Sequence, residues 1–128
     1  KPLTVVGDGT QKRDFVYVDD VVDAFIKATN SKIKNQIFNI GSGKTYSINY
    51  LVKLLGEEKI FIKKRPGEPN CTFANINKAK KILNWEPKID LKNGVKKLLD
   101  NISYWKDAPI WDKRSINKAT KSWFKYLK

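Results

Sequence analysis

Apolar and polar positions in the first half of the chain follow strand-like and helix-like patterns in turn. Short apolar runs at residues 3–6, 14–18 and 36–41 and an alternating run at 59–63 predict strands. Apolar residues at helical spacing predict helices over about residues 19–30 and 48–55. Strands that alternate with helices are typical of an α/β fold, so we expect that architecture.

The second half of the chain is predominantly helical in pattern. Helices are predicted at about residues 78–85, 91–105 and 115–127, with a linker-like stretch near 106–114. We expect helices to begin at polar residues whose side-chain oxygens can accept backbone N–H groups: Asp19 or Asp20, Ser47, Asn75 or Asn77, Asp90 and Ser115. The second helix is expected to end at Gly56. The few short strands make a poor sheet alone, which indicates part of a larger one.

Composition then limits the chemistry. The 128 residues include no histidine and one cysteine, Cys71, which excludes His-based catalytic triads, the usual zinc sites and an intrachain disulfide. The net charge of +13 indicates an anionic partner, although lysine enrichment by itself is an equal explanation. The sequence contains no apolar run of about 20 residues, so we expect a soluble, cytoplasmic protein without a membrane partner.

The stretch "KKRPGEPN", residues 63–70, concentrates positive charge beside a proline-bracketed turn. Arg65 is one of three arginines in a lysine-rich chain, and a planar guanidinium suits phosphate binding better than lysine does. Glu68 either accepts hydrogen bonds from ribose hydroxyls or balances Arg65. Arg13 either binds an anion or pairs with Asp14 or Asp19 at the surface.

Other candidate motifs favour structural roles. "GDGTQKR" and "GSGKTYS" lack the spacing of a P-loop and of a dinucleotide fingerprint, so they are predicted to be turns. The cluster Asp19, Asp20 and Asp23 is interpreted as helix capping rather than as a metal site, and no metal is expected. The aromatic residues at 104–126 are expected to fill a core rather than to stack on bases, so nucleic-acid binding is disfavoured.

Three segments, in this order and spacing, carry a family resemblance: "PLTVVGDGTQKRDFVYVDDVVDAFIKA", "FNIGSGKTYSINYLVKLL" and "RPGEPNCTFANINKAKKILNWEPKIDLKNGVKKLL". They resemble the C-terminal part of extended short-chain dehydrogenases/reductases that act on nucleotide sugars, such as UDP-glucose 4-epimerases, UDP-glucuronate decarboxylases and dTDP-glucose 4,6-dehydratases. The resemblance covers residues 1 to about 105.

The resemblance implies a fold and a set of site residues. Residues 1–105 are expected to be a nucleotide-sugar-binding, C-terminal portion of a Rossmann-type protein, with elements that complete the sheet of the other half, and residues 106–128 a helical extension. Arg13 and Arg65 are similar to the family's diphosphate-binding arginines, and Glu68 stands where the family binds ribose. Pro2 and Leu3 match the segment that packs against the base.

The sequence also departs from the family pattern. The glycine-rich dinucleotide fingerprint and the catalytic Tyr-x-x-x-Lys pair are absent from these 128 residues. We therefore expect no catalytic residue and no bound cofactor in this chain alone. NAD is expected to be held by an N-terminal Rossmann half supplied in cis or in trans. A homodimer is one candidate assembly. The leading hypothesis is the substrate-binding part of an NAD-dependent nucleotide-sugar epimerase or dehydratase, most like UDP-glucose 4-epimerase. The alternatives are a non-catalytic nucleotide-sugar-binding or regulatory module and, below it, a basic nucleic-acid-binding domain.

Overall fold

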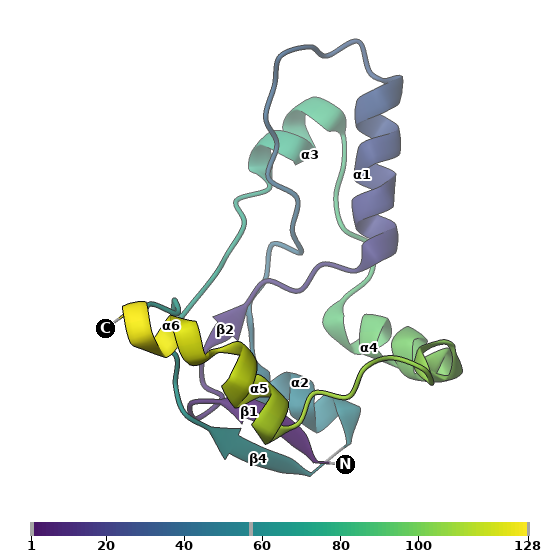
Figure 1. Cartoon of the computed structure of the whole chain (residues 1–128). Coiled ribbons are helices and arrows are strands. Elements are labelled where there is room, and N and C mark those ends of the chain that lie inside the picture. Colours follow the sequence, from purple (N-terminus) through teal and green to yellow (C-terminus); the bar gives the residue numbers. More distant parts are fainter. Residues whose placement is uncertain (1, 57, 128) are drawn as a thin grey trace.

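A computed structural model describes residues 2–56 and 58–127 of the chain, and Figure 1 shows their arrangement. The elements in chain order are β1 (Leu3–Val6), β2 (Lys12–Arg13), α1 (Val18–Asn30), β3 (Tyr46–Ser47), α2 (Ile48–Leu55), β4 (Lys59–Ile62), α3 (Asn77–Leu83), α4 (Leu91–Asp100), the 3-10 helix η1 (Ile102–Trp105), α5 (Lys113–Ala119) and α6 (Lys121–Tyr126).

Two small strand pairs organise the part of the molecule that carries the site. β1 and β4 pair in parallel, with Leu3 opposite Lys59 and Val6 opposite Ile62. α2 precedes β4 and contacts β1, and Val5 at the centre of β1 is 1% exposed. β2 and β3 pair antiparallel, with Arg13 opposite Tyr46. The strands predicted at 3–6 and 59–63 are therefore confirmed.

The main apolar core lies away from the β1–β4 pair, where α1 and α3 run alongside each other (Figure 1). Ala24 of α1 packs with Ile76, Ala79 and Leu83 around Trp85, which is fully buried. The indole Nε1 of Trp85 donates a hydrogen bond to the carbonyl oxygen of Asp20 at 3.0 Å. This bond satisfies the one polar atom of a side chain that otherwise stabilises the core through apolar burial.

The strands predicted at residues 14–18 and 36–41 are wrong for this structure. Neither segment forms a hydrogen-bonded strand, and the short β2 lies just before the first of them. A strand requires backbone donors and acceptors on a neighbouring strand, and the described residues supply none to either segment. Residues 38 and 40 instead pack their side chains against the α1–α3 core.

Several predicted helix boundaries are confirmed. The Ser47 hydroxyl accepts the N–H of Tyr50 at 3.1 Å, and Asp90 accepts that of Asn93 at 2.8 Å. Gly56 ends α2 with φ +73°, a left-handed conformation that glycine adopts without steric cost. α3 begins at Asn77, one of its two predicted starting residues.

Other boundaries differ from prediction. α1 begins at Val18, before both predicted caps, and Tyr17 at its N-cap makes no side-chain capping bond. The predicted helix over 91–105 stops at Asp100 and continues as the 3-10 helix η1. The last predicted helix is two helices, and the first begins at Lys113. Its cap is Asp112, which exchanges hydrogen bonds with Ser115 in a capping box.

The apolar face predicted for α1 is not buried. Phe25 is 71% exposed, and Val22 and Ile26 are also exposed, while Asp20 and Ala24 are the buried residues of this helix. α4 differs less, because Leu91 and Val95 of its predicted stripe are buried. The rest of that stripe, Leu98, Leu99, Ile102 and Trp105, is exposed. Periodicity identified an apolar face on α1 but not whether a partner covers it.

Candidate functional site

The candidate site is built around residues 63–70, which we call the basic loop, and β2. The N–H of Lys12 donates to the carbonyl of Asn70 at 2.8 Å, and the N–H of Thr72 donates to the carbonyl of Lys12 at 3.1 Å. These two backbone bonds hold β2 against the end of the basic loop. They place Arg13, the second residue of β2, beside the loop.

Arg13 and Glu68 form an ion pair in which both side chains are about one-fifth exposed. Nη2 of Arg13 lies 3.1 Å from Oε1 of Glu68, and Nη1 donates to the carbonyl oxygens of Lys12 at 2.8 Å and Pro69 at 2.9 Å. The structure thus brings together two of the predicted site residues. A guanidinium carries five N–H donors, so these three hydrogen bonds do not use all of them.

The alternative partners considered for Arg13 are occupied elsewhere. Asp14 accepts the N–H and hydroxyl of Ser42, each at 2.6 Å, and the N–H of Ala74 at 3.1 Å. Asp19 lies 3.5 Å from the ammonium of Lys97. The surface pairing of Arg13 with either aspartate is therefore wrong, and so is the pairing of Glu68 with Arg65.

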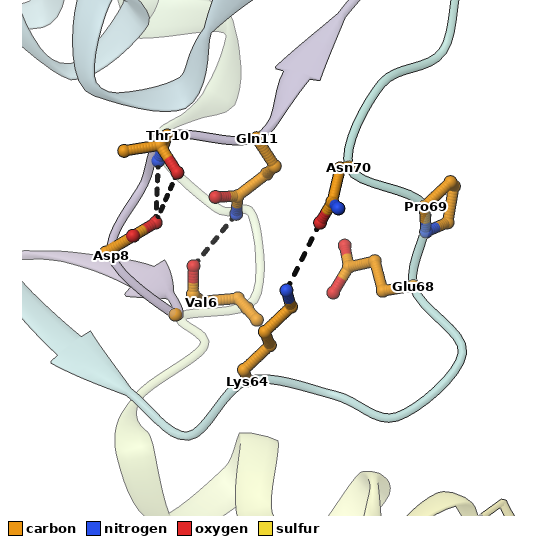
Figure 2. A pocket seen from close by; sticks show the side chains of 9 residues that line it. Val6, Asp8, Thr10, Gln11, Lys64, Glu68, Pro69 and Asn70 are labelled. Atoms are coloured by element: carbon orange, nitrogen blue, oxygen red, sulfur yellow. Dashed lines mark hydrogen bonds between the residues drawn. The ribbon is translucent and has the colours of Figure 1, made fainter.

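The second carboxylate oxygen of Glu68 is buried and has no hydrogen-bond partner among the described residues. A buried carboxylate oxygen without a donor is costly, so this atom is suited to accept a hydroxyl or N–H from a ligand. A cavity of about 170 Å³ lies beside it, and Figure 2 shows its lining. The lining residues come from the end of β1, the turn after it and the basic loop: Val6, Gly7, Asp8, Thr10, Gln11, Lys64, Glu68, Pro69 and Asn70.

Hydrogen bonds hold the walls of this cavity in place (Figure 2). Nζ of Lys64 donates to Oδ1 of Asn70 at 3.2 Å, across the basic loop. Nε2 of Gln11 donates to the carbonyl of Val6 at 2.8 Å. The pKa of the Asp8 carboxyl is lowered chiefly because this group accepts a hydrogen bond from the Thr10 hydroxyl, and next because it accepts one from the Thr10 backbone N–H. Lys64, Asn70 and Gln11 were not predicted as site residues, because nothing in their local sequence indicates a cavity.

Arg65 does not join the Arg13–Glu68 pair. Its guanidinium carbon lies 5.5 Å from the ring centroid of Trp123 in α6. Arg65 and Glu68 do line one open pocket of about 550 Å³, together with Lys63, Lys64, Pro66, Gly67, Asn70, Phe124 and Leu127. The prediction that the aromatic residues at 104–126 fill a core is wrong for those that are exposed: Tyr104, Trp105, Trp111, Trp123 and Tyr126. Trp123 contacts the basic loop instead.

Pro2 and Leu3, the predicted base contacts, lie at the start of β1. Pro2 is exposed, and the N–H of Leu3 donates to the carbonyl of Glu58 at 2.7 Å. The cavity beside Glu68 is lined from Val6 onward, at the other end of the strand. The structure therefore places Leu3 on the strand that leads to the cavity and Pro2 just before that strand, and neither residue lies in the cavity wall.

The turn before α2 does not fit the pyrophosphate of a dinucleotide cofactor. The glycines before α2 are packed against the protein itself: a Cβ at Gly41 would lie 2.5 Å from Cβ of Ala74, and one at Gly43 would lie 2.9 Å from Cδ1 of Ile76. The space that a dinucleotide-binding turn keeps open for pyrophosphate is thus filled by side chains. In the described ranges no group of three or more carboxylate or thiol side chains could hold a metal ion. No helix in these ranges is long and apolar enough to cross a bilayer.

Comparisons with known proteins find relatives of this chain. The model of the NAD dependent epimerase/dehydratase family matches residues 1–41. The UDP-glucuronate 4-epimerase of Thermodesulfobacterium geofontis is 39% identical over 109 residues, which cover 78% of this chain and 33% of that protein. The putative UDP-glucose 4-epimerase of Methanocaldococcus jannaschii is 43% identical over 102 residues, covering 75% and 32% respectively.

Solved structures agree with the sequence comparisons. The UDP-glucose 4-epimerase of Thermotoga maritima, solved with UDP-glucose, superposes with a TM-score of 0.76 at 36% identity, covering 81% of this chain and 35% of that one. The UDP-glucuronic acid 4-epimerase of Bacillus cereus, solved with UDP-glucuronic acid and NAD, gives 0.73 at 36% identity, covering 81% and 36%. The chain spans about a third of the length of these relatives. The α/β fold class and the resemblance found in the sequence are confirmed: the chain is a relative of the NAD-dependent epimerase/dehydratase proteins and resembles their C-terminal portion.

Proposed function

We propose that this chain binds a nucleoside-diphosphate sugar as the substrate-binding part of an NAD-dependent nucleotide-sugar epimerase or dehydratase, most like a UDP-glucose 4-epimerase. The observation that carries the proposal is the Arg13–Glu68 pair: one Glu68 oxygen is buried without a hydrogen-bond partner among the described residues, and Glu68 lines a cavity. The similar epimerases solved with UDP-glucose and with UDP-glucuronic acid support the same ligand class.

In this proposal each predicted residue has a chemical role. The remaining N–H donors of Arg13 and the guanidinium of Arg65 bind the diphosphate, because charge-assisted hydrogen bonds to phosphate are strong and directional. The free oxygen of Glu68 accepts a ribose hydroxyl. Residues 1–105 form this binding portion, and Pro2 and Leu3 stay candidates for contact with the base. Residues 106–128 form a helical extension.

The chain's part in the reaction is proposed to be binding rather than hydride transfer. The turn before α2 is filled by side chains where a dinucleotide-binding turn would hold pyrophosphate, and the sequence holds no Tyr-x-x-x-Lys pair. A Rossmann half in cis or in trans would supply both, and a homodimer of the protein so completed is one candidate assembly.

Calorimetric titration of the chain, in the full protein or complex in which it occurs, with UDP, dTDP and GDP tests the proposal. Arg13→Ala removes charge-assisted hydrogen bonds worth about 1.5–3 kcal/mol. It is therefore expected to weaken binding of the preferred diphosphate by about 10- to 100-fold. Arg65→Ala is expected to weaken it similarly.

Arg114→Ala is the matched control, because Arg114 is the third arginine and is exposed on α5. It removes the same charge and is expected to leave the affinity unchanged. The proposal is wrong if none of the three diphosphates binds, or if Arg114→Ala weakens binding as much as Arg13→Ala does.

A further inference from the structure

The sequence resemblance ends near residue 105, yet the structure seats the last helix on the basic loop. The indole Nε1 of Trp123 in α6 donates to the backbone carbonyl oxygen of Pro66 at 2.8 Å, and the two residues are 57 positions apart in the sequence. Figure 1 shows α6, in yellow, lying across the segment that follows β4. The helical extension is thus in direct contact with the proposed diphosphate-binding loop.

Two further contacts reinforce this docking. The guanidinium of Arg65 lies over the ring of Trp123 at 5.5 Å, and the ammonium of Lys63 lies 5.2 Å from the ring centroid of Phe124. Phe124 and Leu127 also line the pocket of about 550 Å³ that Arg65 and Glu68 share. Two cations of the loop therefore contact two consecutive aromatic rings of the helix.

We propose that Trp123 is a positioning residue for Arg65, and that α6 forms a wall of the nucleotide-diphosphate site. This inference rests on the function proposed above and adds to it a residue outside the family resemblance. The N–H donors of a guanidinium lie in the plane of the group. The contact with the Trp123 ring restrains the Arg65 side chain, and the proposal is that its N–H donors are thereby held for phosphate. The hydrogen bond from Trp123 to Pro66 holds the adjoining turn of the loop in the same place.

The experiment measures UDP affinity by calorimetry in the full protein or complex for a set of tryptophan variants. Trp123→Ala removes both the ring and the indole donor, and it is expected to raise the dissociation constant for UDP about tenfold. Trp123→Leu keeps apolar bulk without an aromatic face and is expected to do the same, which covers the case in which the alanine variant fails to fold. Trp123→Phe keeps an aromatic face and is expected to retain most of the affinity.

Two controls separate positioning from a general loss of structure. Trp111→Ala truncates another exposed tryptophan of the same extension and is expected to leave UDP affinity unchanged. In an Arg65→Ala background, Trp123→Leu is expected to have no further effect, because a residue that acts through Arg65 has nothing left to position.

The outcomes for the two proposals differ. If the unaltered protein binds none of the diphosphates, both the proposed function and this inference are wrong. If UDP binds and Arg65→Ala weakens it, but Trp123→Leu behaves like Trp111→Ala, only this inference is overturned. Tighter UDP binding in Trp123→Leu would also overturn it, because Trp123 would then be holding Arg65 away from the ligand.

Discussion

The aspartates at the start of α1 provide the sharpest stability prediction, because neighbouring residues have opposite environments. Asp20 is 3% exposed, and its two carboxylate oxygens accept the backbone N–H groups of Lys88 at 2.9 Å and Ile89 at 3.0 Å. It therefore joins α1 to the segment that precedes α4. Asp19 is exposed and lies 3.5 Å from the ammonium of Lys97.

The magnitude follows from these hydrogen bonds. Hydrogen bonds to charged groups contribute about 1.5–3 kcal/mol each, and a buried donor left unsatisfied costs about 1–3 kcal/mol. Asp20→Asn keeps the shape of the side chain but replaces one acceptor oxygen with an N–H₂ donor. It is therefore expected to lower the free energy of unfolding by about 2–4 kcal/mol, a large part of the roughly 5–15 kcal/mol typical of a domain.

Urea unfolding followed by circular dichroism measures this change. Asp19→Asn is the matched control, with the same chemistry one residue away, and its exposed ion pair is expected to contribute less than about 1 kcal/mol. Equal midpoints for the two variants would refute the reasoning. So would a loss in Asp19→Asn greater than that in Asp20→Asn.

Two further predictions concern the turn after β1. Gly9→Ala is expected to destabilise the protein more than Gly56→Ala in the same urea assay. Both glycines have positive φ. A Cβ at Gly9 would lie 2.5 Å from Oδ1 of Asn49, whereas a Cβ at Gly56 would have no atom within 4 Å. Equal losses would contradict the steric argument. Thr10→Val removes the hydrogen bond that contributes most to the lowered pKa of Asp8, so an NMR titration of the Asp8 carboxyl is expected to show its pKa rising toward its usual value. Because the folded-state pKa is lowered, the stabilisation from this carboxylate is present above its usual pKa and is lost as pH falls through the lowered value. An unchanged Asp8 pKa in Thr10→Val would show that the Thr10 hydroxyl does not cause the lowering.

Local features of the fold were predictable wherever the deciding residues are neighbours in the chain. Ser47 and Asp90 cap their helices through N–H groups three residues away, and Gly56 ends α2 by its own conformational freedom. The parallel strand pair was predictable as two strands from its β-branched and alternating residues. The family resemblance was equally local in origin, since it depends on short motifs read in order.

Predictions failed where a distant partner decides the structure. The segments 14–18 and 36–41 have strand-like composition, but a strand forms only where another strand pairs with it. Asp20 has a residue type that caps helices, yet it lies inside α1, and its oxygens accept backbone N–H groups 68 and 69 positions away. The apolar periodicity of α1 was real, but burial of that face depends on what packs against it.

In the candidate site too, the sequence decides some features and the tertiary structure decides others. The sequence alone determined that the chain concentrates arginine and lysine beside a rigid turn. Through the family resemblance it also predicted that Arg13, Arg65 and Glu68 bind a diphosphate and its ribose. Only the tertiary structure decided that Arg13 pairs with Glu68, 55 positions away, and that Arg65 lies over Trp123 in α6. The physical reason is that residue chemistry and local spacing are properties of the chain, whereas the partner of a charged side chain is whichever group the folded backbone brings within a few ångströms of it.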